Sequence, residues 1–495
     1  MHAIVPSSSN SFIHPTYWPQ ASNSALNDAP PLRLKSPFQL ASSSTVETTS
    51  ENFSSRAPQR RRHCVRVDCP VQSVLSSSSS HPFDDLSWIS AMDSSSEDYG
   101  LSDIADLSEL PIPTSVVEEA GPEARPVNFG AGPSALPESV LEEACKGLFN
   151  FKGTGIGIAE ISHRSKEFTS LVADLENNIR TQLGVPPTHK IIFTQGGGTG
   201  QFSAVVLNLL ARHRLLHPDL SDEQRVLDYV ITGSWSKKAM EEAKRLGGGS
   251  VHIAVDARAK SEDSKSYDNI PAHEDFDFSA DPALIYYCGL WPLVADYSSS
   301  FMSRKIPRIA DHAVIFAGAQ KNIGPAGLTI LIVRQDCIVD VDAAAKLGAV
   351  PVPITMSYKT NADAGSLYNT PSTLSIYIAG LVLERSKKLG GVEYFESVNG
   401  RKAQKVYTAL QEGEEKGVYR SKVKEGSGSW MNVVFDVLGD NAESKFLAGA
   451  EALGMKALKG HRSVGGIRIS LYNAITEEQT DRIVAYLKDF PTQIS

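Results

Sequence analysis

The sequence predicts an α/β fold in which a mostly parallel sheet is covered by helices, followed by a smaller α+β unit at the C-terminus. From residue 126 onward, short and nearly continuous apolar segments alternate with helical segments, which is the pattern of a parallel sheet buried on both faces. The 495 residues allow two or three domains, and 41% apolar residues allow a large core. No apolar run reaches the ~20 residues of a membrane span, so we expect no membrane contact.

Residues 1–124 lack the pattern of a folded domain, because serine runs recur and periodicity is weak. The first 80 residues, with 7 basic and 4 acidic side chains, fit an organelle transit peptide, but residues 84–123 are acidic and do not. A targeting segment, a disordered tail and an upstream sequence wrongly joined to the gene all remain open. We expect a cytoplasmic protein, with organelle targeting as the alternative.

The net charge of −9 lies almost entirely in this N-terminal segment. It holds 15 acidic and 7 basic residues, whereas residues 125–495 hold 42 and 41. A nearly neutral folded region gives no reason to expect a nucleic-acid partner, and anion binding there needs a few placed cations. The five cysteines have no metal-ligand spacing, so we expect no metal site. They indicate free thiols in a reducing compartment. Cys288 is expected to be a small core residue.

The large domain is expected over residues 125–390, and residues 125–137 are a segment that can pack on the small domain. Pro137 opens a helix that follows a glycine-rich loop, and its apolar face is Val140, Leu141, Ala144 and Leu148. Strand candidates are Lys190–Thr194, Val226–Thr232, Val251–Val255, Ala283–Cys288, Leu293–Asp296, Ala313–Ala317 and Leu328–Val333. Helical patterns cover Glu167–Leu183, Thr199–Arg212, Lys237–Leu246 and a long apolar stretch from Pro371 to about Lys388.

The small domain is expected over residues 391–495 as an α+β unit. Its elements are a strand at Met431–Val437, a helix at Ala442–Leu453, a strand at Ile467–Leu471 and a helix at Glu477–Lys488.

The glycine-rich segment Gly196–Gly200 follows a predicted strand and opens a predicted helix. Glycines let backbone amides approach a phosphate, whose charge the helix N-terminus favours. The alternative to a phosphate site is a strained strand-to-helix turn that binds no ligand. The spacing is not that of the dinucleotide fingerprint.

Two ionisable residues stand just after predicted strands. Lys321 lies among the small residues of Ala317–Gly327, where a planar cofactor could reach its amine and form a Schiff base. Asp296 ends an apolar strand, so its carboxylate could pair with a pyridinium nitrogen and keep a ring protonated as an electron sink. The plain alternatives are a surface lysine in a turn and a helix cap.

An aromatic residue and separated cations complete the candidates. Trp235 follows a strand and could stack on a planar cofactor, although a core or loop-packing role is the alternative. The His163–Arg164 and His461–Arg462 pairs, with Arg468, suggest a substrate with two acidic groups, because arginine binds carboxylate and phosphate bidentately. For each arginine an ordinary surface ion pair is the commoner role.

These motifs together resemble the phosphoserine aminotransferases, within the class V branch of fold-type-I enzymes that use pyridoxal phosphate. The resemblance covers about Asn128 to Ile494 and rests on several pieces in the family's order. The most specific are Phe129–Pro133 with Leu136–Pro137, Ile161–Phe168, Gln195–Phe202, Thr232–Trp235, Ala317–Gly327, Tyr368–Pro371 and Gly460–Arg468.

The resemblance implies a role for each candidate. Lys321 would bind the cofactor covalently and transfer the proton, Asp296 would pair with the ring nitrogen and Trp235 would stack on the ring. The residues implied to hold the cofactor phosphate are Gly198, Thr199, Gln320 and, from a partner subunit, Asn369 and Thr370. Arg468 would bind the substrate α-carboxylate, and the distal acidic group would contact His163 and Arg164 (from the partner chain), His461 and Arg462.

The implied reaction converts L-glutamate and 3-phosphohydroxypyruvate to 2-oxoglutarate and O-phospho-L-serine, in a homodimer with shared sites. Another class V enzyme, acting on serine and glyoxylate or on cysteine, is a near alternative. The paired cations favour a substrate with a second acidic group, and no loop cysteine supports a desulfurase. A silent subunit and a simple anion-binding module are readings from other classes, of which the second leaves Lys321 and Asp296 unexplained.

The sequence departs from the family between two predicted strands. The family carries an Asn-Glu-Thr motif after the strand that here ends at Cys288, whereas this chain has only Gly289–Pro292 before Leu293. A parallel crossover needs about a dozen residues, and four extended residues span at most ~14 Å. We therefore expect either a distorted connection or a splice form or gene model that lacks a segment, and we favour the missing segment. As a hypothesis, the chain as written binds its cofactor weakly and has little or no activity.

Overall fold

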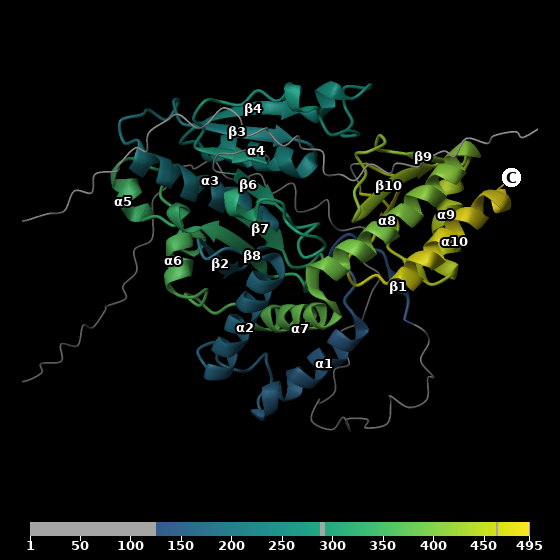
Figure 1. Ribbon diagram of the computed structural model, residues 1–495, viewed down its shortest axis with the longest axis horizontal. Helices are drawn as coiled ribbons and strands as arrows, with labels where there is room; N and C mark the ends of the chain where they lie inside the picture. Colours follow the sequence, from purple (N-terminus) through teal and green to yellow (C-terminus); the bar gives the residue numbers. More distant parts are fainter. Residues whose placement is uncertain (1–124, 288–292, 462–463, 495) are drawn as a thin grey trace, which may run out of the picture. The chain divides into compact units, whose positions relative to one another are not determined.

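The computed structural model describes residues 125–287, 293–461 and 464–494 (Figure 1). Residues 121–495 form one compact unit. The expectations for residues 1–124, for Cys288 and for Arg462 lie outside the described residues. In the described part of the chain, no helix combines the length and the apolar character needed to cross a membrane.

A seven-stranded sheet forms the centre of residues 189–334, with the strand order β2-β8-β7-β6-β5-β3-β4. Pairing is parallel from β7 to β4, and only β8 runs against its neighbours β7 and β2. The predicted, mostly parallel sheet is therefore confirmed. The strands are β2 (His189–Thr194), β3 (Val226–Ile231), β4 (Ser250–Asp256), β5 (Leu284–Tyr286), β6 (Leu293–Asp296), β7 (His312–Gly318) and β8 (Thr329–Arg334).

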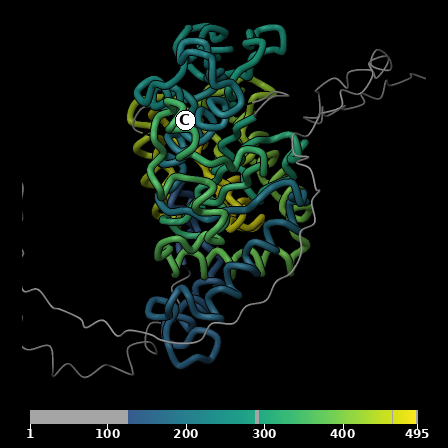
Figure 2. Tube along the Cα trace, turned by 90° about the vertical axis from the view of Figure 1, so that its left-hand side faces the viewer, coloured from purple at the N-terminus to yellow at the C-terminus, as the bar shows by residue number. Residues whose placement is uncertain are grey.

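Helices cover both faces of this sheet, because alternate strand residues point to opposite sides. Ile191 and Phe193 of β2 face one core with helices α1, α2 and α7, whereas Ile192 faces the other core with α3 and α4. The helices are α1 (Glu138–Phe149), α2 (Lys166–Leu183), α3 (Gly197–Leu216), α4 (Ser234–Leu246) and α7 (Thr373–Leu389). In both views α1 lies at the end of the described unit opposite to β4 (Figures 1 and 2).

The predicted apolar face of α1 is partly wrong. Val140 and Ala144 are buried as expected, but Leu148 is 40% exposed. Gly147 is buried instead, because its Cα lies against the Tyr377 ring, where an added Cβ would come within 2.4 Å of the ring. The helix packs through a glycine at this point, so the larger neighbouring side chain is turned outward.

The C-terminal elements build a separate core. The sheet β9-β10-β12 is antiparallel and packs with helices α8, α9 and α10. Val127 and Phe129 lie in this core, and β1 pairs with β11, so the first described residues pack on C-terminal elements. The elements are β1 (Val127–Asn128), α8 (Gly391–Glu415), β9 (Tyr419–Ser421), β10 (Asn432–Val437), α9 (Ala442–Ala452), β11 (Met455–Lys456), β12 (Ile467–Ser470) and α10 (Glu477–Ile494).

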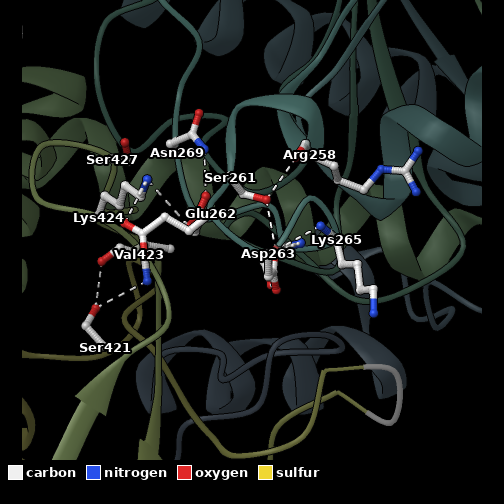
Figure 3. A network of polar contacts seen from close by, with 12 residues as sticks. Arg258, Ser261, Glu262, Asp263, Lys265, Asn269, Ser421, Val423, Lys424 and Ser427 are labelled. Carbon is white, nitrogen blue, oxygen red and sulfur yellow. Dashed lines mark hydrogen bonds and ion pairs between the residues drawn. The ribbon is translucent and has the colours of Figure 1, made fainter.

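Polar contacts tie a loop of the large domain to the strand region of the small one (Figure 3). The Lys424 amide donates to the carbonyl of Asp268 at 2.7 Å, and the Lys424 ammonium lies 3.6 Å from the Glu262 carboxylate. The Ile270 amide donates to Ser427 Oγ at 3.1 Å. These bonds join two segments about 150 residues apart in sequence without using any candidate site residue.

The strands flanking the short connection are parallel neighbours, as the sequence predicted. Ile285 of β5 lies opposite Leu293 of β6, and Tyr286 lies opposite Val294. The chain passes from one strand to the other through residues 287–292, of which 288–292 lie outside the described residues.

Candidate active site

The N-terminus of α3 is open to an anion. Its cap residue is Gly196, whose φ of +103° no ordinary side chain adopts readily, and no side chain caps the first amides of this 20-residue helix. An added Cβ on Gly198 would lie 3.4 Å from Ser298 Oγ and 4.0 Å from Asp296 Oδ2. Gly196 and Gly197 both have positive φ, which glycine adopts readily, and the turn presents backbone amides beside Asp296.

Asp296 ends β6 and is half-buried next to this helix. Its Oδ1 accepts a hydrogen bond from the Ser298 amide at 2.8 Å, so it also caps the turn that follows the strand. Burial raises the pKa of the Asp296 carboxyl, and the Ser298 bonds and the positive charge of Lys321 oppose this only in part. A protonated ring nitrogen would stabilise the ionised carboxylate, which is the role expected from the sequence.

Lys321 follows β7 and its amine is enclosed by the loop at residues 130–133. Its Nζ donates to the carbonyl of Ala131. An added Cβ on Gly132 would lie 3.0 Å from both Nζ and Cδ of Lys321, so only glycine fits there without moving the lysine. From the small domain, the Tyr472 ring lies 5.8 Å from Nζ, and Tyr472 Oη donates to the same Ala131 carbonyl at 3.1 Å.

Three predicted site residues hold buried polar atoms that have no hydrogen-bond partner within the described part of the chain. These atoms are His163 Nε2, Gln320 Oε1 and Arg468 Nε. Gln320 folds back over Gly318, where an added Cβ would come within 2.5 Å of its Oε1. Buried polar atoms are rarely unpaired in native proteins, and a bound molecule would give these three atoms partners, although ten other buried polar atoms of the described residues also lack one.

The remaining predicted residues lie on the surface. Trp235 begins α4, is 54% exposed and lies under the Lys238 ammonium at 4.6 Å from the ring centre. Arg164, Asn369, Thr370 and His461 are exposed. The Thr370 carbonyl accepts bonds from Gln195 and Asn369 at 2.6 and 3.3 Å. In this single chain these side chains are exposed to solvent.

Reasoning from sequence missed Ala131, Ser298 and Tyr472. Ser298 Oγ accepts from the Gly318 amide at 3.0 Å and so joins the ends of β6 and β7. Tyr472 follows Arg468 by four residues along the same strand and turn, which was the one available signal for it. The acceptor at Ala131 is a backbone carbonyl, and no side-chain pattern can reveal it.

A separate cluster of His213, His217 and Asp281 brings three potential metal ligands within 4.8 Å of one another. However, Arg225 donates to His213 Nδ1 at 2.8 Å, and arginine cannot accept. The neutral imidazole must therefore carry its proton on Nε2, the nitrogen left to face a metal. The pKa of His213 is lowered to about 4, mainly by burial. This cluster is better explained as packing around the buried Arg225.

The described residues fit the pyridoxal phosphate implied by the resemblance. The open amides of α3 are donors of the kind that a phosphate needs, and Asp296 adjoins them. The Lys321 amine lies within the electrostatic reach of Asp296. A phosphate site, a carboxylate for a ring nitrogen and an amine for an aldehyde are thus present together.

Comparisons find known proteins that are similar to this chain along almost the whole described unit. A family model described as "Aminotransferase class-V" matches residues 127–270 and 291–483, which leaves β5 and most of the short connection unmatched. The phosphoserine aminotransferase of Ectopseudomonas mendocina (strain ymp) is 40% identical over 382 residues, covering 74% of this chain and 98% of that protein.

Two solved structures are similar in fold and sequence. A phosphoserine aminotransferase from Bacillus circulans subsp. alkalophilus matches with a TM-score of 0.67 and 32% identity, covering 75% of this chain and 99% of that chain. A PLP-bound phosphoserine aminotransferase from Trichomonas vaginalis matches with a TM-score of 0.64 and 32% identity, covering 74% and 100%.

Proposed function

We infer that Lys321 and Asp296 form the catalytic centre of this chain, which belongs to the phosphoserine aminotransferases of the class-V aminotransferase family. It is a pyridoxal-phosphate-dependent transaminase that converts L-glutamate and 3-phosphohydroxypyruvate to 2-oxoglutarate and O-phospho-L-serine, in serine biosynthesis. One observation carries the assignment of the site: the Lys321 amine, the Asp296 carboxylate and the open N-terminus of α3 converge at the ends of β6, β7 and β2.

Each residue has a task that follows from its position. Lys321 would hold the cofactor through its amine, and the freed amine would move the proton from the substrate Cα. Asp296 would keep the ring nitrogen protonated, and the amides of Gly198 and Thr199 with the Gln320 side chain would hold the phosphate. Trp235 would pack on the ring. When bound, the cofactor supplies a sink for the electron pair left on the substrate carbon.

Substrate preference tests this function directly. We expect purified protein to convert L-glutamate and 3-phosphohydroxypyruvate faster than serine and glyoxylate, because only the first pair has a second acidic group for the cationic pocket. A coupled assay of 2-oxoglutarate release measures the first reaction, and a coupled assay of hydroxypyruvate formation measures the second. Preference for serine and glyoxylate would reassign the chain within class V, and cofactor binding without either reaction would support the silent-subunit alternative.

Arg468 is proposed to bind the substrate α-carboxylate, and its unpartnered Nε supports this. We expect Arg468→Lys to raise KM for L-glutamate about tenfold, because one of two charged hydrogen bonds is lost while the charge remains. The cofactor absorbance should stay unchanged. Steady-state kinetics measure the effect, and Arg420→Lys, an exposed arginine paired with Asp436, is the control. An unchanged KM for glutamate would remove Arg468 from the substrate site.

We also propose that the active form is a homodimer in which each site is shared. Asn369 and Thr370 reach the cofactor phosphate of the partner, and His163 and Arg164 from the partner chain bind the distal acidic group with His461 and Arg462. The exposure of Arg164, Asn369 and Thr370 in the single chain supports this arrangement. We further propose a large domain at residues 125–390 and a small domain at 391–495, which the separate hydrophobic cores support.

Shared sites predict complementation between two inactive variants. Lys321→Ala and Arg164→Ala dimers, unfolded and refolded together at equal amounts, should regain up to about a quarter of normal activity. Half of the dimers are then mixed, and each mixed dimer has one intact site. Activity of the mixture is compared with each variant alone. If the mixture stays inactive while mixed dimers form, both residues belong to the same subunit's site.

A further inference from the structure

A buried ammonium group in the small domain has no part in the site described so far. Lys402 lies on α8 and is fully buried. Its Nζ donates to the carbonyls of Leu471, Tyr472 and Ile475 at 2.9, 3.1 and 2.8 Å. Burial lowers the pKa of Lys402 to about 7, and the Glu477 carboxylate opposes this shift. An ammonium in such a place needs all its acceptors, so it holds the turn at residues 471–475 in one conformation.

The same turn reaches the reactive lysine through Tyr472. The Tyr472 side chain is 1% exposed, and Asn432 Nδ2 lies 3.2 Å from its hydroxyl oxygen. The hydroxyl has two acceptors, and the Ala131 carbonyl at 3.1 Å is nearer than Asn432 Oδ1 at 3.3 Å. The Ala131 carbonyl also accepts from Lys321 Nζ, so one carbonyl oxygen serves both donors. The hydroxyl bond weakens the hold of this carbonyl on the Lys321 amine, which is the group that reacts with aldehydes.

A second contact of the turn fixes the residue next to Lys321. The Asn473 amide donates to Asn322 Oδ1 at 3.0 Å, and Asn322 Nδ2 donates to the Ser299 carbonyl at 3.1 Å. Asn399, one turn before Lys402 on α8, donates to Asn473 Oδ1 at 2.9 Å. The turn at residues 471–475 is thus bonded on one side to α8. On the other side it is bonded to Asn322, the neighbour of Lys321, and to the Ala131 carbonyl that accepts from Lys321.

We propose that Lys402 and Tyr472 are positioning residues for Lys321: Lys402 fixes the turn at residues 471–475, and Tyr472 shares the Ala131 carbonyl so that the Lys321 amine is free to react. The inference rests on the proposed role of Lys321. It assigns a task to a buried lysine that touches neither substrate nor cofactor, and it couples the small domain to the reactive amine.

The test measures the reactivity of the Lys321 amine in protein without cofactor. Apo-protein is labelled with limiting acetic anhydride between pH 7 and 9, and the acetylation rate of the Lys321 peptide is read by mass spectrometry. We expect Tyr472→Phe to slow labelling of Lys321 about 3- to 10-fold near pH 7, the equivalent of one hydrogen bond. Lys402→Met should slow it similarly, and the double variant should be no slower than the slower single variant. Lys405→Met, on the exposed side of α8, is the matched control.

Each outcome decides the proposal. General loosening of the structure would speed labelling of Lys321, so faster or unchanged labelling in Tyr472→Phe overturns it. If the double variant slows labelling by the product of the two single effects, Lys402 does not act through Tyr472. If Lys402→Met does not fold, the Tyr472→Phe result stands alone and is sufficient. Slower labelling in a protein that cannot take up pyridoxal phosphate would support the positioning role and count against the proposed function.

Discussion

Replacing Lys321 by alanine is expected to abolish the near-visible absorbance of bound pyridoxal phosphate and to lower transamination at least ~10⁴-fold. Proton transfer by a placed side chain contributes about 10²–10⁴-fold, and the covalent bond to the cofactor is lost with the same amine. The neighbouring groups cannot replace it, because the enclosing atoms at residues 131 and 132 are a backbone carbonyl and a glycine.

Absorbance spectra before and after addition of L-glutamate, together with single-turnover kinetics, measure this effect. Lys488→Ala is the matched control, because Lys488 is an exposed lysine of α10 whose pair with Glu412 contributes little to stability. In the unchanged chain the band should shift when glutamate is added. A band that persists and shifts in Lys321→Ala would mean that another amine holds the cofactor, and the assignment of the catalytic centre would be wrong.

The proposed catalytic centre was predictable because its ionisable residues follow the ends of strands. Asp296 and Lys321 each follow an apolar strand, and the carboxyl ends of parallel strands meet at one edge of a sheet. The glycines at residues 196–200 were visible for the same reason. What the sequence could not show is that the acceptor beside Lys321 is the backbone of Ala131, or that Tyr472 approaches it from another domain, since both depend on packing between distant segments.

The largest missed element is α8. Its 25 residues include two glycines after the first position and the fully buried Lys402, so the apolar period expected of a helix is interrupted. The strand predictions held better, because most of the central strands are nearly continuous apolar runs. Residues that would act across a subunit interface, such as Arg164 and Thr370, stay predictions, since their partners belong to a second chain.

The connection between β5 and β6 is shorter than two parallel neighbouring strands usually need. Parallel strands in register need a return path, and the usual path of a dozen or more residues contains a helix. Here Ile285 and Leu293 are opposite each other and only residues 287–292 join the two strands. The class-V match also breaks off at residue 270 and resumes at 291. Asp296 is three residues past Leu293, so a distorted connection would displace the carboxylate that serves the cofactor.

Lengthening this connection is therefore expected to raise turnover and cofactor affinity. Inserting a family-length segment that carries Asn-Glu-Thr after Tyr287 should increase kcat/KM by about 10²-fold, because a 1 Å misplacement of catalytic groups costs about that much. The threonine adds a hydrogen bond worth about 0.5–1.5 kcal/mol, which should tighten cofactor binding severalfold. Titration of the apo-protein with pyridoxal phosphate and steady-state kinetics measure the two effects.

An insertion of equal length built from glycine and serine separates the two causes. If strand placement is the limiting factor, the neutral insertion should recover most of the gain in turnover, and the Asn-Glu-Thr version should add mainly cofactor affinity. If both insertions leave turnover and affinity unchanged, the six-residue connection is tolerated. Asp296 would then be correctly placed by its bond with Ser298 and by pairing of β6 with β7, and the chain as written would be the working enzyme.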